Sequence, residues 1–147
     1  MNEFFCFPSI FNIDFEKLKE EDVKGIIVDI DNTIAPYNQK VLKPEIKKWF
    51  FNLEKRGFKI CLVSNSLKER VDFFSSRLEI PAVDKAIKPS KRGFLKAVNI
   101  LNISKENIIV IGDQIFTDIW GGNRAGLKTI LVNPMDKNEF IFTKFMR

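Results

Sequence analysis

Short runs of β-branched and aliphatic residues alternate with amphipathic segments along this chain, and no other feature constrains its fold as strongly. Strands buried on both faces are expected from the near-continuous apolar runs at residues 25–30, 59–63, 107–111 and 128–132, with a weaker candidate at 82–86. Strands separated by helices pair in parallel through right-handed crossovers. We therefore predict an α/β fold, in which a central parallel sheet is flanked by helices.

Helices are predicted between these strands from their apolar periodicity and their end signals. Pro44 suits the first turn of one helix, and Gly57 stands where that helix should end. Ser66 and Glu69 have the spacing of a capping box at the start of the next helix. Two more helices are expected after Ser90 and over residues 117–125.

The length of 147 residues, with 45% hydrophobic and 29% charged residues, fits one globular domain over residues 1–147. Residues 1–13 are predicted to be an apolar N-terminal extension and residues 135–147 a C-terminal tail. No apolar run approaches the roughly 18–20 residues of a membrane span, and the N-terminus lacks the basic region of a signal peptide. A soluble, cytoplasmic protein is expected.

The chain contains no histidine, which excludes several classes of catalytic site. A Ser-His-Asp or Cys-His nucleophile, a His-ligated metal and an imidazole base are all impossible. The two cysteines, Cys6 and Cys61, are too few for a four-thiolate site. The net charge of +5 favours anionic partners without selecting one. Catalysis would have to use carboxylates, lysines, hydroxyls, backbone amides and a metal.

Polar residues follow the predicted strands where each one ends. In an open parallel sheet these ends lie along one edge, and ligands bind there. Four loops are thus expected to converge, carrying Asp29, Asp31, Ser64, Asn65, Lys88, Asp113 and Asp118.

The chemistry of these side chains favours phosphoryl transfer. Asp29 and Asp31 are two residues apart, so both should point the same way, and Asp113 supplies a third carboxylate. An all-oxygen site of this kind suits Mg²⁺. Lys88 offers a positive charge for a phosphate, and backbone amides near Asn65 can bind its oxygens. Positioning and charge neutralisation do most of the work in phosphoryl transfer, and a carboxylate is the plausible nucleophile.

The motifs resemble those of the haloacid dehalogenase superfamily. Asp29-Ile30-Asp31-Asn32-Thr33 is similar to its DxDxT signature, and Ser64, Lys88 and the stretch GDQIFTD match its later motifs in order. Together with the opening DIDNTIAPYN, the stretch GDQIFTDIWGGNRAGLKTILVNP resembles more narrowly the YqeG-type subfamily IIIA phosphatases, which are related to phosphatidylglycerophosphatases. The resemblance implies a three-layer Rossmann-like core and a phosphomonoester hydrolase.

The resemblance also implies a role for each matching residue. Asp29 would be the nucleophile that forms an aspartyl-phosphate, and Asp31 the general acid and then the base. The carboxylates of Asp29 and Asp113 and the backbone carbonyl of Asp31 would hold Mg²⁺. Ser64 and Lys88 would bind the phosphoryl group. Asp118 would orient Lys88 or the waters of the metal, and Thr33 of the signature would be a second supporting residue. Gln114 departs from the small or acidic residue of many members.

Simpler interpretations compete with these roles. Asp29 could form an Asx turn, Asp118 could cap a helix, Ser64 could belong to a turn, and Lys88 could be a surface lysine. At the level of function, the rival hypothesis is a non-catalytic module of the same fold that binds a phosphorylated or ribosomal partner. The presence of both Asp29 and Asp31 favours the enzyme, because only the enzyme needs both.

Loop lengths predict an open site. Thirty residues separate Thr33 from Ser64 and 23 separate Ser64 from Lys88, whereas a cap domain would need roughly 50 or more. An open site suits a phosphate carried by a lipid, a protein or a nucleic acid, and phosphatidylglycerophosphate is the predicted substrate. The apolar N-terminal residues Phe4, Phe5, Phe7, Ile10 and Phe11 would either contact an anionic bilayer peripherally or strap across the core.

Overall fold

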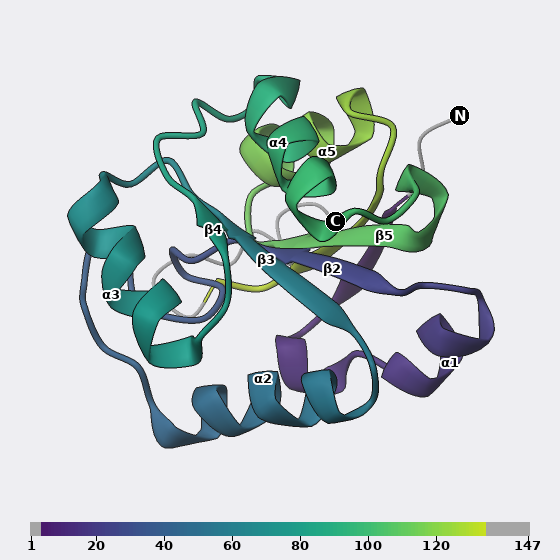
Figure 1. The fold of residues 1–147 in the computed structure, drawn as a ribbon, viewed down its shortest axis with the longest axis horizontal. Helices are drawn as coiled ribbons and strands as arrows, with labels where there is room; N and C mark the ends of the chain where they lie inside the picture. The colour runs from purple at the N-terminus through teal and green to yellow at the C-terminus, as the bar shows by residue number, and fades with distance from the viewer. Residues whose placement is uncertain (1–3, 135–147) are drawn as a thin grey trace.

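Six parallel strands form one central sheet in the computed structural model, which describes residues 4–134 (Figure 1). Their order across the sheet is β1-β6-β5-β2-β3-β4, and every neighbouring pair is parallel. The strands are β1 (Phe4–Phe7), β2 (Gly25–Val28), β3 (Lys59–Val63), β4 (Ala82–Val83), β5 (Ile108–Gly112) and β6 (Lys128–Val132). The predicted parallel α/β architecture is confirmed.

Helices connect the strands and cover both faces of the sheet (Figure 1). The α-helices are α1 (Phe15–Glu20), α2 (Pro44–Lys55), α3 (Lys68–Leu78), α4 (Lys91–Leu101) and α5 (Trp120–Arg124). Shorter helical turns are the 3₁₀-helices η1 (Ile10–Asn12) and η2 (Lys105–Asn107) and the π-helix η3 (Ile115–Ile119).

The pleat of the central strand β2 divides the core into two layers. Ile26 and Val28 join the apolar cluster that contains the buried residues of α1, α2 and α3. Ile27 points to the opposite face, into the cluster that contains Phe94 of α4 and Ala125 just after α5. Because β2 buries both of its faces, its sequence is continuously apolar rather than alternating. The molecule thus has the predicted three layers.

The strand order places a switch point between β2 and β5. After β2 the chain adds β3 and β4 on one side, and it then returns to add β5 and β6 on the other. In open α/β sheets, ligands bind outside the carboxyl ends of the strands at such a point. Asp29 and Asp113 follow β2 and β5 there, and the Asp29 amide donates to the Ile111 carbonyl at 3.0 Å. The fold therefore brings these two aspartates together.

Part of the predicted N-terminal extension is an edge strand of the sheet. Residues Phe4–Phe7 pair in parallel with β6, and Ile10 is buried in the core. Phe5 and Phe11 are 54% and 55% exposed. The interpretation of this segment as a strap packed on the core is therefore correct for its backbone, while two of its phenylalanines still face outward. The predicted C-terminal tail at residues 135–147 lies outside the described residues.

The weak strand candidate at residues 82–86 is wrong for its second half, because β4 contains only Ala82–Val83. Lys85 and Ile87 both have positive φ, which turns the chain out of the sheet. The Ala86 amide donates to the Ser64 carbonyl at 3.0 Å, so this turn packs against the loop that follows β3. The shortened strand delivers Lys88 to the edge of the sheet.

The predicted capping box at the start of α3 is also wrong. The N-cap residue is Leu67, and no side chain caps the helix. The hydroxyl of Ser66 instead contacts Asp31 and Arg70, and Glu69 forms an ion pair with Lys40. Ser66 and Glu69 therefore form contacts across the site, and neither caps the N-terminus of α3.

The connections beside the site are short. Between β2 and β3 the chain contains a loop and α2, and between β3 and β4 it contains α3. Within residues 4–134 no further domain is inserted there, in agreement with the prediction of a site without a cap. No helix among these residues is long and apolar enough to cross a membrane.

Candidate active site

Lys88 lies at the centre of the site and joins two aspartates. Its Nζ donates to Asp29 Oδ1 and to Asp118 Oδ1, both at 2.6 Å, and to the Val63 carbonyl at 3.3 Å. Its side chain is only 4% exposed. Burial by itself would lower the pKa of Lys88, but the charges of Asp118 and Asp29 outweigh burial and raise it. Lys88 is therefore a fixed positive charge, and the interpretation as a surface lysine is wrong.

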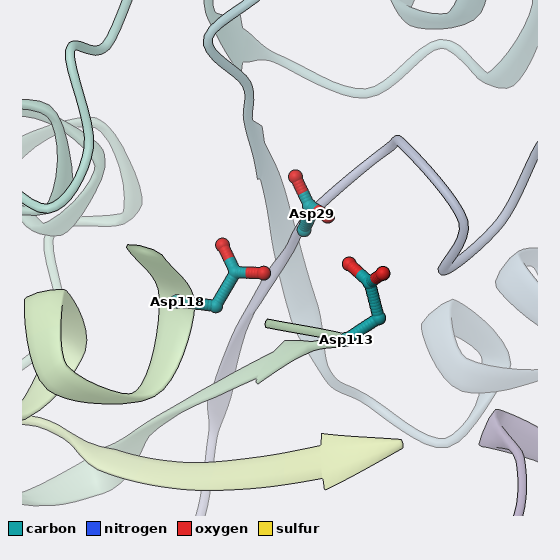
Figure 2. Close-up of side chains that lie close together, drawn as sticks. All are labelled: Asp29, Asp113 and Asp118. Carbon is teal, nitrogen blue, oxygen red and sulfur yellow. The ribbon is translucent and has the colours of Figure 1, made fainter. Parts of the chain in front are cut away.

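Asp29, Asp113 and Asp118 converge from three separate elements, as Figure 2 shows. One carboxylate oxygen from each lies within 4.8 Å of the others, and all three residues are buried. Burial, followed by the charges of Asp29 and Asp118, raises the pKa of Asp113 to about 9. Burial and the charge of Asp29 likewise raise the pKa of Asp118 to about 7, against the opposing effect of Lys88. One lysine thus does not neutralise this cluster.

The cluster fits a divalent cation. Asp113 Oδ1 is buried and has no hydrogen-bond partner within the described part of the chain. A buried acceptor without a donor is costly, and hard cations such as Mg²⁺ take carboxylate oxygens as ligands. Two of the predicted metal ligands, Asp29 and Asp113, therefore lie where a cation would be stabilised. Asp118, which was predicted only to support the site, belongs to the same group of carboxylates.

Asp31 lies apart from this cluster and has its own cation. Its side chain is 22% exposed, and its Oδ1 pairs with Arg70 at 2.8 Å. Asp29 and Asp31 nevertheless line the same cavity, which has a volume of about 580 Å³. Asn32 adopts a φ of 60°, and the chain turns sharply after Asp31. The two aspartates therefore face one space with different partners.

The remaining predicted residues differ in how close they come to the cavity. Asn65 lines it and holds the backbone of Lys88, accepting from the Lys88 amide at 2.7 Å and donating to the Lys88 carbonyl at 3.4 Å. Thr33 is buried and donates to Asp29 Oδ2 at 3.4 Å. Ser64 is fully buried, and its hydroxyl accepts from the Ser66 amide at 3.0 Å, as in a turn. Phosphate binding by Ser64 stays a prediction.

Gln114 is exposed at the cavity, and its backbone amide donates to Asp118 Oδ2 at 3.3 Å. Its side-chain oxygen accepts from Thr117 at 2.9 Å. Asp118 thus accepts from the backbone of its own helical turn while it binds Lys88. No side chain caps η3 or the helix α5 that follows it, so the interpretation of Asp118 as a helix cap is wrong, and its supporting role stays a prediction.

Comparison with known proteins identifies the family. The family of haloacid dehalogenase-like hydrolases matches residues 9–126, which include every residue of the cluster. The chain belongs to this hydrolase family. The predicted membership of the haloacid dehalogenase superfamily and the predicted class of phosphomonoester hydrolase are confirmed.

The hydrolase is similar to curated proteins of the same family. It is 44% identical to the "probable phosphatase YqeG" of Bacillus subtilis over 95% of this chain and 81% of that protein. It is 28% identical to an Arabidopsis thaliana phosphatidylglycerophosphate phosphatase, over 86% of this chain but only 39% of that longer protein. The first match confirms the narrower YqeG-type group.

Solved structures share the fold of the hydrolase. The cobalt-bound deoxy-D-mannose-octulosonate 8-phosphate phosphatase of Haemophilus influenzae superposes with a TM-score of 0.62. The match covers 78% of this chain and 70% of that one at 14% identity, which establishes similarity of fold alone.

Sequence reasoning missed Arg70 and the role of Ser66. From the sequence, Arg70 would be expected on the solvent-facing side of an amphipathic helix. In the structure it lies on α3, is buried and contacts Asp31. One signal was available, since Arg70 stands four residues after Ser66, the spacing that would place both on one face of the helix predicted to start there.

Proposed function

We propose that this hydrolase is a Mg²⁺-dependent phosphatase that cleaves a phosphomonoester through an aspartyl-phosphate on Asp29. One observation carries the proposal: Asp29 is held by the buried Lys88 beside Asp113 at a cavity that Asp31 also lines. A nucleophile, an anion-binding lysine, a set of metal ligands and a second carboxylate are thus collected at one place. The family and its phosphatase members support the same chemistry.

In the first half of the proposed reaction, a carboxylate oxygen of Asp29 attacks phosphorus. The bond between phosphorus and the ester oxygen breaks, and the leaving oxygen takes a proton from Asp31. The phosphoryl group is then attached to Asp29 as an acyl phosphate. Lys88 fixes Asp29 for this attack through its 2.6 Å contact and supplies positive charge to the transferring group.

In the second half, the Asp31 carboxylate takes a proton from a water molecule whose oxygen attacks the same phosphorus. The bond from phosphorus to Asp29 breaks, inorganic phosphate leaves, and the Asp29 carboxylate is restored. General acid–base catalysis of this kind contributes about 10²–10⁴-fold to a rate. Asp31 is suited to both steps because it lines the cavity while remaining outside the cluster of buried carboxylates.

The metal would be held by the carboxylates of Asp29 and Asp113 and by the backbone carbonyl of Asp31, with Asp118 beside it. Mg²⁺ would supply the positive charge that the buried carboxylates and a bound phosphate require. The unpartnered Asp113 Oδ1 and the raised pKa of Asp113 support this placement.

A lipid-borne phosphate, phosphatidylglycerophosphate, is the substrate that we propose. No inserted domain covers the site within residues 4–134. Exposed apolar side chains are present at the cavity: Tyr37 and Leu67 line it, and the exposed Ile87 directly precedes Lys88. A bilayer in contact with these apolar side chains could present a lipid headgroup to the cavity. The similarity to a phosphatidylglycerophosphate phosphatase supports a substrate of this lipid class.

The experiment that tests the function is a phosphate-release panel of lipid and soluble monoesters, each with Mg²⁺ and with a chelator. We expect release that requires Mg²⁺ and disappears in Asp113→Ala. Release from no substrate, combined with tight binding of a phosphorylated ligand, would instead favour the non-catalytic module. Full activity after exhaustive treatment with chelator would overturn the metal assignment.

A further inference from the structure

Arg70 is a buried cation beside the site that the reaction proposed above does not use. Its side chain is only 8% exposed, although it lies in the first turn of α3. Its guanidinium lies 5.3 Å from the centre of the Phe74 ring, and its Nε has no hydrogen-bond partner among the described residues. Burying an arginine is costly unless its other nitrogens are well paired. The contacts of those nitrogens therefore need an explanation.

The guanidinium closes the loop that carries Asp31. Its Nη2 contacts Asp31 Oδ1 at 2.8 Å and donates to the carbonyls of Pro36 and Gln39 at 3.3 and 3.0 Å. The start and the end of the loop from Asp31 to Gln39 thus meet at one side chain of α3. The Asn38 amide completes the closure by donating to Asp31 Oδ1 at 2.9 Å.

These contacts distinguish the two oxygens of Asp31. Oδ1 forms the ion pair with Arg70 and accepts a hydrogen bond from the Asn38 amide. Among residues 4–134, Oδ2 accepts a single longer hydrogen bond, 3.3 Å, from the Ser66 hydroxyl, which itself accepts from Arg70 Nη1 at 3.1 Å. Oδ1 is therefore occupied by the contacts that orient the carboxyl group, and Oδ2 is the oxygen left to exchange a proton.

We propose that Arg70 is a positioning residue that, with Ser66, fixes Asp31 so that its Oδ2 exchanges the proton with the leaving group and with water. This inference rests on the proposed function of Asp31. The two arms of the planar guanidinium have different partners, with Nη2 on Asp31 and the loop carbonyls and Nη1 on the Ser66 hydroxyl, whereas a lysine ammonium lacks this fork. Misplacing a catalytic group by about 1 Å can cost about 10²-fold in rate.

The test compares an alkyl phosphate with an activated aryl phosphate, whose leaving oxygen needs no proton. In Arg70→Met we expect kcat for the alkyl ester to fall by about 10²-fold, with a much smaller loss for the aryl ester and little change in KM. Asp31→Asn should show the same pattern. The double variant should be no worse than Asp31→Asn alone, because both changes remove one function. Arg70→Lys should recover only part of the loss.

Arg77→Met is the matched control, because Arg77 is an exposed arginine of the same helix that lies 3.8 Å from the Phe73 ring. It should keep wild-type rates on both esters. Equal losses on alkyl and aryl esters in Arg70→Met, or additive losses in the double variant, would overturn the positioning role. If Arg70→Met does not fold, the alkyl and aryl esters are compared in Arg70→Lys and Ser66→Ala instead. A wild-type protein that is inactive on both esters would refute the proposed function itself.

Discussion

Asp29 and Asp31 stand two residues apart, yet each is paired with a different buried cation. Lys88 binds Asp29 and Asp118, whereas Arg70 binds Asp31. Asp29 is fixed beside the other buried carboxylates, whereas Asp31 is held through Oδ1 and keeps the more weakly bound Oδ2 for proton transfer. The difference between the proposed nucleophile and the proposed acid therefore lies in their partners.

The first prediction concerns the nucleophile. Asp29→Asn should remove turnover by several orders of magnitude, because an amide cannot form the acyl phosphate. In metal-free buffer alkaline enough to ionise Asp113 and Asp118, it should also raise the melting temperature, since it then removes one of three clustered negative charges. Phosphate release and thermal melting measure the two effects. Near-wild-type turnover in Asp29→Asn would show that the covalent mechanism is wrong.

The second prediction follows from Asp113 and Asp118, whose pKa values are raised from 3.8 to about 9 and about 7 in the folded protein. Because the folded state holds these protons more tightly than the unfolded state, the stabilisation is fully present below the unfolded pKa. It is lost as pH rises through the folded pKa values. In metal-free buffer the free energy of unfolding should fall between about pH 4 and about pH 9, by up to about 1.4 kcal/mol per pH unit for each proton.

Denaturant unfolding at several pH values measures this slope. Asp113→Asn should flatten it, because the amide keeps the shape of the protonated acid and does not titrate. Mg²⁺ should restore stability most at the alkaline end, where the carboxylates are ionised and can bind it. A slope that is unchanged in Asp113→Asn would contradict the assignment.

At the scale of elements, the site depends on the close approach of β5 to the π-helix η3. Gly112 ends β5, and a Cβ added to it would lie 2.4 Å from the carboxyl carbon of Asp118. Asp118 has little freedom to move, since it is held by Lys88 and by the Gln114 amide. A side chain at Gly112 is therefore incompatible with this position of Asp118.

The third prediction is that Gly112→Ala displaces Asp118 and so disturbs Lys88. We expect a destabilisation of about 1–3 kcal/mol and a large loss of kcat. Gly25→Ala is the control at the opposite end of the sheet, where a Cβ would lie 3.1 Å from Ile108 and 3.2 Å from Ile103. It should cost stability but retain activity per folded molecule. Equal effects on activity in the two variants would argue against a specific role of this contact.

At the scale of the whole molecule, the absence of an inserted domain beside the site in residues 4–134 leaves the cavity without a cover. Most of the residues that line it are polar or charged, and the exposed side chains of Tyr37 and Leu67 add apolar surface. Little in this arrangement would enclose a small metabolite and exclude water around it. Discrimination among substrates should therefore depend on what carries the phosphate.

The fourth prediction is a preference for the lipid substrate. The specificity constant for phosphatidylglycerophosphate in mixed micelles should exceed those for soluble sugar and nucleotide monophosphates. Ile87→Glu should reduce turnover of the micellar lipid while sparing a soluble ester, and Phe51→Glu, at an exposed position of α2, is its control. A soluble monophosphate that is clearly preferred over the lipid would contradict the argument from the open site.

Local sequence patterns were enough to predict the four central strands β2, β3, β5 and β6, their parallel direction and the meeting of Asp29, Lys88, Asp113 and Asp118. These features follow from local patterns, because apolar runs specify buried strands and the carboxyl ends of parallel strands share one edge. The polar residues at those ends could therefore be assigned to one site before any contact was known.

The partner of each of these residues, in contrast, depends on contacts between segments that are distant in the sequence. The same Ser66 and Glu69 spacing fits a helix cap and a contact across the site, and packing selected the second. Arg70 and Asp31 are 39 positions apart, and no local pattern encodes their pairing. The edge strand β1 likewise exists only because β6 offers it a partner. Contacts between distant segments depend on the summed packing of the whole chain, and for this reason the sequence pattern could not supply them.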